Sequence, residues 1–283
     1  MSTGPVGPAD GAGQHNATRL RQTCSADGRI LQPEKPLTPI DATFQAVLNG
    51  SGGSGVRSVP AAAIWGTFSG AKAPATGFAQ LTYHILAVDA EPQLELLRGD
   101  IYKPLAATFS KHGGDSGQGV PWPGEALMIR DWHKSSACVD GADALHSGCL
   151  SGFVPESSSA TQVVHALDGG SSGPPTPTGV ARKLQLLTIT PVPHNGSAWV
   201  LLGELSKFVT VASARFERLT IGQGGISGTI RGGANEIVHV VALQPNAPNW
   251  PDRGWTVRSG NATLGASGQC DLSINVLGVF CDA

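Results

Sequence analysis

The sequence predicts a mainly β protein whose C-terminal region is an antiparallel β-sandwich. Charged residues make up only 14% of the 283 residues, and the helix formers Lys, Glu and Met are scarce, whereas Val, Ile, Thr and Gly are plentiful. This balance favours short strands joined by turns over helix bundles. The 38 Gly and 20 Pro interrupt the chain often, yet stay below the level typical of disordered proteins. With 40% apolar residues, the chain can bury a sizeable core.

The opening segment, residues 1–44, differs from the rest of the chain. A Gly/Pro-rich stretch leads to Asn16, which suits a helix N-cap, and residues 17–24 place apolar side chains on one face of a short helix. An Asp-Gly turn at residues 27–28 ends this helix, and the prolines of residues 33–39 require an extended chain. Because a short helix is marginal in water on its own, we expect this segment to dock on the sandwich or to be disordered.

Residues 45–178 are predicted to form a β-rich region with long loops. Residues 61–70 and 78–90 have the composition of strands, and the second run alternates only partly, which indicates burial on both faces. Ser, Gly, Pro and Asp are frequent in residues 110–124 and 134–178. These two stretches are therefore predicted to be mainly loop and linker.

Residues 179–283 have the most regular strand pattern and are predicted to form the sandwich. An Asn-Gly turn within residues 194–197 lies between two apolar runs, which predicts a hairpin. Further apolar runs follow, separated by turns that contain Gly or Asn, as in an antiparallel sandwich. These runs cover residues 215–222, 226–232, 236–245, 255–264 and 270–280.

The charge pattern argues against nucleic acid and membranes as partners. The formal net charge is −2 and no basic run occurs, so a phosphate backbone or an anionic lipid surface has no matching face. No apolar stretch reaches the roughly 18 residues that a membrane-spanning helix needs. The first residues lack both a basic start and an apolar block, so we expect no signal peptide there.

The five cysteines leave the compartment open between secretory and cytoplasmic. Cys138 and Cys149 are 11 positions apart, and so are Cys270 and Cys281. Each pair is a candidate disulfide in an oxidising compartment, and Cys24 is then left over.

Four glycosylation sequons give a second hint about the compartment. They begin at Asn16, Asn49, Asn195 and Asn261 and use half of the eight asparagines. Two of them overlap Asn-Gly turn signals, so turn chemistry explains part of the excess.

No metal, cofactor or catalytic motif is predicted. His133, Cys138, His146 and Cys149 lie close together in sequence, but their spacing is unlike the paired ligands of a zinc site. Nucleophile motifs such as G-x-S-x-G are absent, and the sequence alone pairs no two carboxylates.

The Gly-rich start of the chain is a candidate ligand site. Gly4, Gly7, Gly11 and Gly13 surround Asp10 just before the predicted helix. Backbone N–H groups at such a turn can bind an anion or a polar ligand, while the acid accepts hydrogen bonds from ligand hydroxyls. The alternative is an ordinary turn that leads into a helix.

Two tryptophans are candidate sugar contacts. Trp122 and Trp250 each precede a proline in loops rich in Gly, Pro or Asn, where an exposed ring offers a face to a sugar. Trp65, Trp199 and Trp255 lie within apolar strands and are predicted to pack in the core.

Residues 1–44 resemble a known family. The resemblance rests on Ser2, Gly4, Pro5, Val6, Asp10, Gly13, His15, Asn16, Leu20, Asp27, Gly28, Ile30, Leu31, Asp41 and Phe44. In this order and spacing they resemble the raffinose synthase and seed-imbibition group, the alkaline α-galactosidase-like proteins of glycoside hydrolase family 36. A weaker similarity returns at residues 186–211, where that family's C-terminal sandwich begins.

The resemblance implies a carbohydrate-metabolising enzyme of which this chain is the C-terminal part. In that family, the segment matching residues 2–24 is the last strand and helix of a (β/α)8 barrel, and the catalytic carboxylates lie on earlier barrel strands. The chain would be a fragment, a C-terminal accessory region of a hydrolase or galactosyltransferase for α-galactosides, not catalytic without its barrel. Its partners would be that barrel and a carbohydrate, with Asp10, Gly4 and His15 as substrate contacts.

A second function remains open. The sequons, the paired cysteines and the loop tryptophans would also suit a secreted carbohydrate-binding β-sandwich that acts alone.

Overall fold

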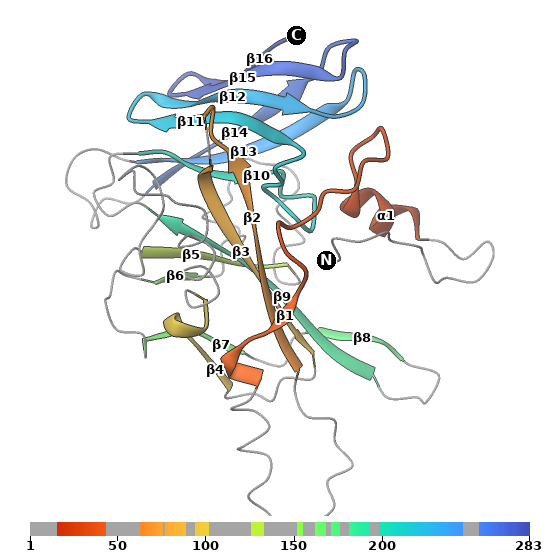
Figure 1. The fold of residues 1–283 in the computed structure, drawn as a ribbon, viewed down its shortest axis with the longest axis vertical. Helices are drawn as coiled ribbons and strands as arrows, with labels where there is room; N and C mark the ends of the chain where they lie inside the picture. Colours follow the sequence, from red (N-terminus) through yellow and green to blue (C-terminus); the bar gives the residue numbers. More distant parts are fainter. Residues whose placement is uncertain are drawn as a thin grey trace, which may run out of the picture.

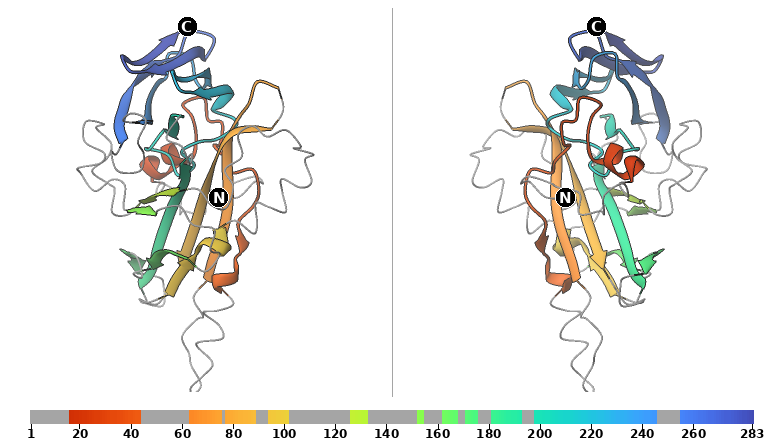
Figure 2. Two further views of the ribbon diagram at one scale, coloured as in Figure 1. Left: turned by 90° about the vertical axis from the view of Figure 1, so that its left-hand side faces the viewer. Right: turned by 90° about the vertical axis from the view of Figure 1, so that its right-hand side faces the viewer.

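The structure, a computed structural model, is mainly β with antiparallel sheets, as the sequence predicts. It describes residues 16–43, 63–75, 77–88, 94–101, 126–132, 152–154, 162–167, 171–175, 181–192, 198–245 and 255–283. Figures 1 and 2 show a long-stranded sheet, a β-sandwich at one end of it, and the helix α1 at its side.

The larger sheet has seven strands in the order β1-β2-β3-β9-β5-β6, and β8 also pairs with β9. Its side chains alternate between two faces. One face carries Phe68, Tyr83 and Ile189 into an apolar core, whereas the other carries buried polar side chains such as that of His84. The strands are β1 (Thr38–Pro39), β2 (Ala63–Lys72), β3 (Phe78–Val88), β5 (Ala126–Asp131), β6 (Gly152–Val154), β8 (Ser171–Pro175) and β9 (Ala181–Val192).

Strand β3 is buried on both faces over most of its length, as its sequence predicts. It lies between β2 and β9, so both of its edges are paired. A separate two-stranded sheet, β4 (Leu94–Leu97) with β7 (Val163–Leu167), adds Leu96 and Leu167 to the same core.

The sandwich consists of a three-stranded sheet, β10-β13-β14, and a four-stranded sheet, β11-β12-β15-β16. Their facing sides bury Trp199, Phe216, Val240 and Leu272 in one cluster. Trp199 and Trp255 are buried, as predicted, while Trp65 is half-buried. The strands are β10 (Val200–Gly203), β11 (Phe216–Gly222), β12 (Gly225–Arg231), β13 (Ile237–Pro245), β14 (Trp255–Thr263), β15 (Gln269–Asn275) and β16 (Gly278–Asp282).

The hairpin predicted around residues 194–197 is wrong. The apolar runs on either side form β9 and β10, but these strands belong to different sheets. Both edges of β9 are occupied. Strand β3 pairs with one edge, and β5 and β8 pair with different parts of the other edge. Strand β10 therefore pairs with β13 instead. Strand β9, although it falls in the range 179–283, therefore completes the larger sheet.

The described part of the opening segment docks on the β region. Asn16 begins α1 (Ala17–Thr23) as its N-cap, and its side-chain oxygen accepts a hydrogen bond from Arg19 N at 3.0 Å. Beyond the helix, Leu31 packs against the loop between β10 and β11, and Ile40 enters the core of the larger sheet. Of the two outcomes expected from the sequence, residues 16–43 show docking.

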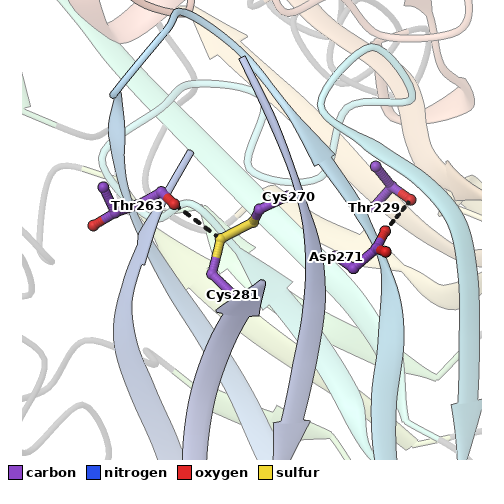
Figure 3. The surroundings of a disulfide bond; sticks show 5 residues. All are labelled: Thr229, Thr263, Cys270, Asp271 and Cys281. Atoms are coloured by element: carbon purple, nitrogen blue, oxygen red, sulfur yellow. Dashed lines mark hydrogen bonds between the residues drawn. A yellow bond between two sulfur atoms is a disulfide. The ribbon is translucent and has the colours of Figure 1, made fainter. Parts of the chain in front are cut away.

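A disulfide joins the last two strands of the sandwich. Cys270 on β15 and Cys281 on β16 are bonded, with Cα atoms 5.5 Å apart, and Cys281 Sγ also lies 3.3 Å from the carbonyl oxygen of Thr263 (Figure 3). Cys24 is a free thiol. Cys138 and Cys149, the other candidate pair, lie outside the described residues.

Candidate functional site

A cavity lies where the opening segment joins the edge of the larger sheet. It measures roughly 230 Å³ and opens between the chain around β1, strands β2 and β3, and a helical turn at residues 98–101. We call it the Lys35 pocket. It is lined by Lys35, Pro36, Thr38, Ile40, Gly66, Thr67, Phe68, Tyr83, Ile85, Asp100 and Ile101.

The floor of the Lys35 pocket is apolar because one face of the sheet supplies it. Phe68 on β2 pairs with Tyr83 on β3, and Ile85 lies two residues further along the same face. At Gly66, a Cβ atom would lie only 2.8 Å from Ile40 Cγ2. The absent side chain lets the opening segment approach the sheet and close one wall of the pocket.

The rim of the Lys35 pocket is polar and held in place by main-chain contacts. Thr67 Oγ1 donates to the carbonyl oxygen of Lys35 at 2.5 Å, and Glu34 N donates to that of Phe68 at 2.8 Å. These bonds place the exposed Lys35 side chain at the mouth, with its ammonium 5.7 Å from the Phe68 ring centroid. The exposed Thr38 adds a hydroxyl group at the same rim.

Asp100 brings a carboxylate to the inner wall. The helical turn presents it, and its Oδ2 accepts a hydrogen bond from Leu97 N at 2.9 Å. The turn is anchored by the buried Arg98, whose Nε donates to Gln162 Oε1 at 2.7 Å, and by Ile101 in the core. The carboxylate is thus buried and positioned by rigid neighbours.

These groups suit a small ligand that has an apolar face and several hydroxyl groups. The floor can cover the apolar face, while Lys35, Thr38 and Asp100 offer donors and acceptors for hydroxyls. Glycoside hydrolysis needs two carboxyl groups about 5 to 10 Å apart. Asp100 is the one carboxylate among the described residues that line the Lys35 pocket.

Most of the sequence-predicted site residues lie in the parts of the chain that the structure leaves undescribed. These are Gly4, Asp10, His15, Trp122 and Trp250, together with Asn49 and Asn195. The structure therefore does not test them as ligand contacts or glycosylation sites.

The two sequon asparagines that are described are both exposed. Asn16 caps α1, and Asn261 on β14 has its Oδ1 2.9 Å from His239 Nδ1. Among the described residues, no three His, Cys, Asp or Glu side chains gather as metal ligands, and no helix has the length and apolar character to cross a membrane.

Sequence reasoning missed the Lys35 pocket. Lys35 lies in a proline-spaced stretch and Asp100 in a Gly-Asp turn, and no motif links the two. Only the pairing of β1 with the edge of β2 and the placement of the turn at residues 98–101 bring them to one pocket.

Comparison with known proteins adds no relative: no protein-family model matches the chain, and no curated protein has a matching sequence.

Proposed function

We propose that the chain is the C-terminal accessory region of an enzyme that acts on α-galactosides such as the raffinose-family sugars, and that catalysis requires a (β/α)8 barrel in addition. The resemblance of residues 1–44 to the raffinose synthase and seed-imbibition group is the starting point. The way in which α1 is held is the observation that carries the proposal.

Helix α1 is attached at one end and exposed along its length. None of its seven residues is buried, and the side chain of Leu20 is 40% exposed. Its C-terminal end is held by hydrogen bonds from Lys207 and from Phe208 N to main-chain oxygens of residues 21–24. A seven-residue helix is marginal in water without packing. The arrangement supports a role as the last barrel helix, joined to the β region by its end and packed elsewhere by its apolar side.

The Lys35 pocket supports a binding role rather than independent catalysis. Among the described residues its lining holds a single carboxylate, Asp100, and it suits a ligand with hydroxyl groups. A sugar residue bound here would hold an oligosaccharide on the enzyme without being cleaved.

The test combines the purified chain with the (β/α)8 barrel of a raffinose synthase-like α-galactosidase that lacks its own C-terminal region. We expect a stable complex in size-exclusion chromatography with light scattering, and hydrolysis of an aryl α-galactoside by the complex but not by the chain alone. Leu20→Glu should prevent complex formation because it places a charge on the exposed apolar side of α1. Leu277→Glu is the matched control, since Leu277 is 82% exposed in the β15–β16 turn.

Two results would contradict the proposal: hydrolysis by the isolated chain, or no association between folded chain and folded barrel.

A carbohydrate-binding sandwich that acts alone is the second candidate, and the Lys35 pocket favours it independently of α1. The isolated chain would then bind glycans without any barrel. A glycan array with the isolated chain separates the two proposals, because selective binding with no association to the barrel supports the second alone.

A further inference from the structure

Three arginines of the described chain are almost completely buried, and one of them has no hydrogen bond or ion pair to another side chain. Arg215 forms ion pairs with Glu204 and Glu236, and Arg98 donates to Gln162. Arg130 differs from both. Its Nη2 donates to a main-chain oxygen, that of Leu205, at 2.8 Å, while its buried Nε and Nη1 have no hydrogen-bond partner.

The Arg130 guanidinium is held firmly in this position. Its Cζ lies 4.8 Å from the centre of the Trp132 ring, in a cation–π contact. The Trp132 ring packs in turn on Phe208, with ring centres 4.7 Å apart. Both Leu205 and Phe208 belong to the loop between β10 and β11, so this loop fixes the guanidinium from one side.

The same face of the larger sheet carries further buried polar atoms without partners. Register places Arg130 on β5 opposite Thr188 on β9, and Thr188 opposite His84 on β3. His84 Nε2 lies 2.8 Å from Ser69 Oγ, but its Nδ1 has no partner, and neither has Thr82 Oγ1. All of these atoms lie on one side of three adjacent strands because side chains alternate along each strand.

The described residues of this face provide no negative charge to Arg130. Thr188, Thr190 and Met128 are neutral, and Asp131, the next residue on β5, points to the opposite face, where it accepts a hydrogen bond from Gln185. Burial lowers the pKa of Arg130 to about 10, against an opposing effect of the Asp131 carboxylate, so the side chain still carries its charge at neutral pH. Burial also lowers the pKa of His84 to about 3, which leaves that ring neutral.

Unpaired buried donors are costly, and so is a buried charge whose neighbouring carboxylate, Asp131, is bonded on the opposite face of the sheet. We propose that Arg130 is the centre of a buried oxyanion site that takes the carboxylate or phosphate group of a small ligand. The guanidinium would donate through Nε and Nη1. The site is separate from the Lys35 pocket, which lies on the other face of the sheet, and does not depend on the proposed function.

Part of the surrounding chain must move for a ligand to enter, because Nε and Nη1 are closed off from solvent. We therefore expect anion binding to Arg130 to reach saturation slowly.

The test follows the Arg130 Nε–H signal in ¹⁵N-labelled protein during separate titrations with inorganic phosphate and with acetate, at constant ionic strength kept with sodium chloride. We expect a saturable shift with at least one of the two anions and a higher melting temperature at saturation. The two titrations distinguish phosphate from carboxylate as the preferred group. Arg130→Met should weaken this binding by roughly tenfold or more, since it removes the charged donor.

The matched control is Arg258→Met. Arg258 on β14 is half-buried and its Nε donates to Gln244 at 2.7 Å, so its loss should leave anion binding unchanged. Should Arg130→Met fail to fold, the Arg130 signal of the unmodified protein in the two titrations still decides the matter. An unshifted Arg130 signal at high concentrations of both anions would overturn the proposal, as would equal stabilisation of Arg130→Met and the unmodified chain.

Discussion

The ammonium group of Lys207 donates a hydrogen bond to the main-chain oxygen of Cys24 at 2.8 Å, and thereby ties the end of α1 to the loop between β10 and β11. A second bond from the same group reaches the oxygen of Arg21 at 2.7 Å. The carbonyl groups of a helix's last turn lack partners within the helix, and a cation is favourable there. Residues 183 positions apart are joined in this way.

Loss of the two Lys207 hydrogen bonds should make α1 less stably attached to the β region. Lys207→Met removes both hydrogen bonds, so we expect faster amide hydrogen exchange over residues 17–24 and a loss of about 1 to 3 kcal/mol in the free energy of unfolding. Lys72→Met is the control, because Lys72 is exposed at the end of β2. Unchanged exchange in α1 would show that other contacts hold the helix.

The disulfide should stabilise the edge of the sandwich. Strand β16 also packs on β14, where a Cβ on Gly260 would lie 2.8 Å from Val279 Cβ, so releasing β16 exposes core residues. For a loop of this length, we expect Cys281→Ser to lower the free energy of unfolding by about 2 to 3 kcal/mol in denaturant titrations. A reductant should abolish the difference in stability between the unmodified chain and Cys281→Ser. Cys24→Ser, which alters the free thiol, should leave the difference between oxidised and reduced protein intact.

Glu236 should make stability depend on pH through its pairing with Arg215. Burial raises the pKa of Glu236, but the hydrogen bond and the positive charge of Arg215 lower it by a larger amount. The net pKa therefore lies below the ordinary value. A carboxylate with a lowered folded-state pKa stabilises the fold above its unfolded-state pKa, and this contribution is lost as the pH falls through the folded-state pKa.

Glu236→Gln is therefore expected to unfold more easily at pH 7, by about 1 to 3 kcal/mol, with the difference shrinking at acidic pH. Denaturant titrations at several pH values measure this. Glu217→Gln offers a control, because its ion pair with Arg231 is partly exposed and should contribute under about 1 kcal/mol. A constant difference between pH 7 and pH 3 would contradict the assignment to Glu236.

Sugar binding at the Lys35 pocket should depend on its two charged groups. Lys35→Met and Asp100→Asn each remove one charged hydrogen-bonding group while keeping similar size. We expect each to weaken binding of methyl α-galactoside by roughly tenfold in NMR titrations. Lys72→Met again serves as the control, because Lys72 lies on β2, one of the two strands that form the pocket floor, but does not line the pocket. If the substitutions change nothing, or if the chain shows no saturable shifts of pocket residues, the pocket is not the sugar site.

Features that depend on neighbouring residues were predictable from the sequence. Asn16 caps α1 because a side-chain oxygen at this position reaches a nearby main-chain N–H. Strand β3 is buried on both faces, as its mixed apolar pattern indicates. The same reasoning is wrong at residues 194–197, because an Asn-Gly turn signal carries no information about strand edges that are already occupied.

The candidate sites could not be predicted from patterns of neighbouring residues. Lys35 and Asp100 line one pocket only because β1 pairs with the edge of β2 and the turn at residues 98–101 lies beside the same sheet face. No sequence motif distinguishes Arg130 from the other arginines. The lack of hydrogen-bond partners at its Nε and Nη1 follows from the register of β5 against β9.

The sequence by itself determined the mainly β class, the strands of the sandwich and the capped helix, because apolar periodicity and turn residues act over a few positions along the chain. Tertiary structure decided which strands pair, which face of the larger sheet is polar, and which distant groups meet, as Lys207 meets Cys24. These relationships depend on strand order and register, and a shift of one residue would turn every side chain of a strand to the other face.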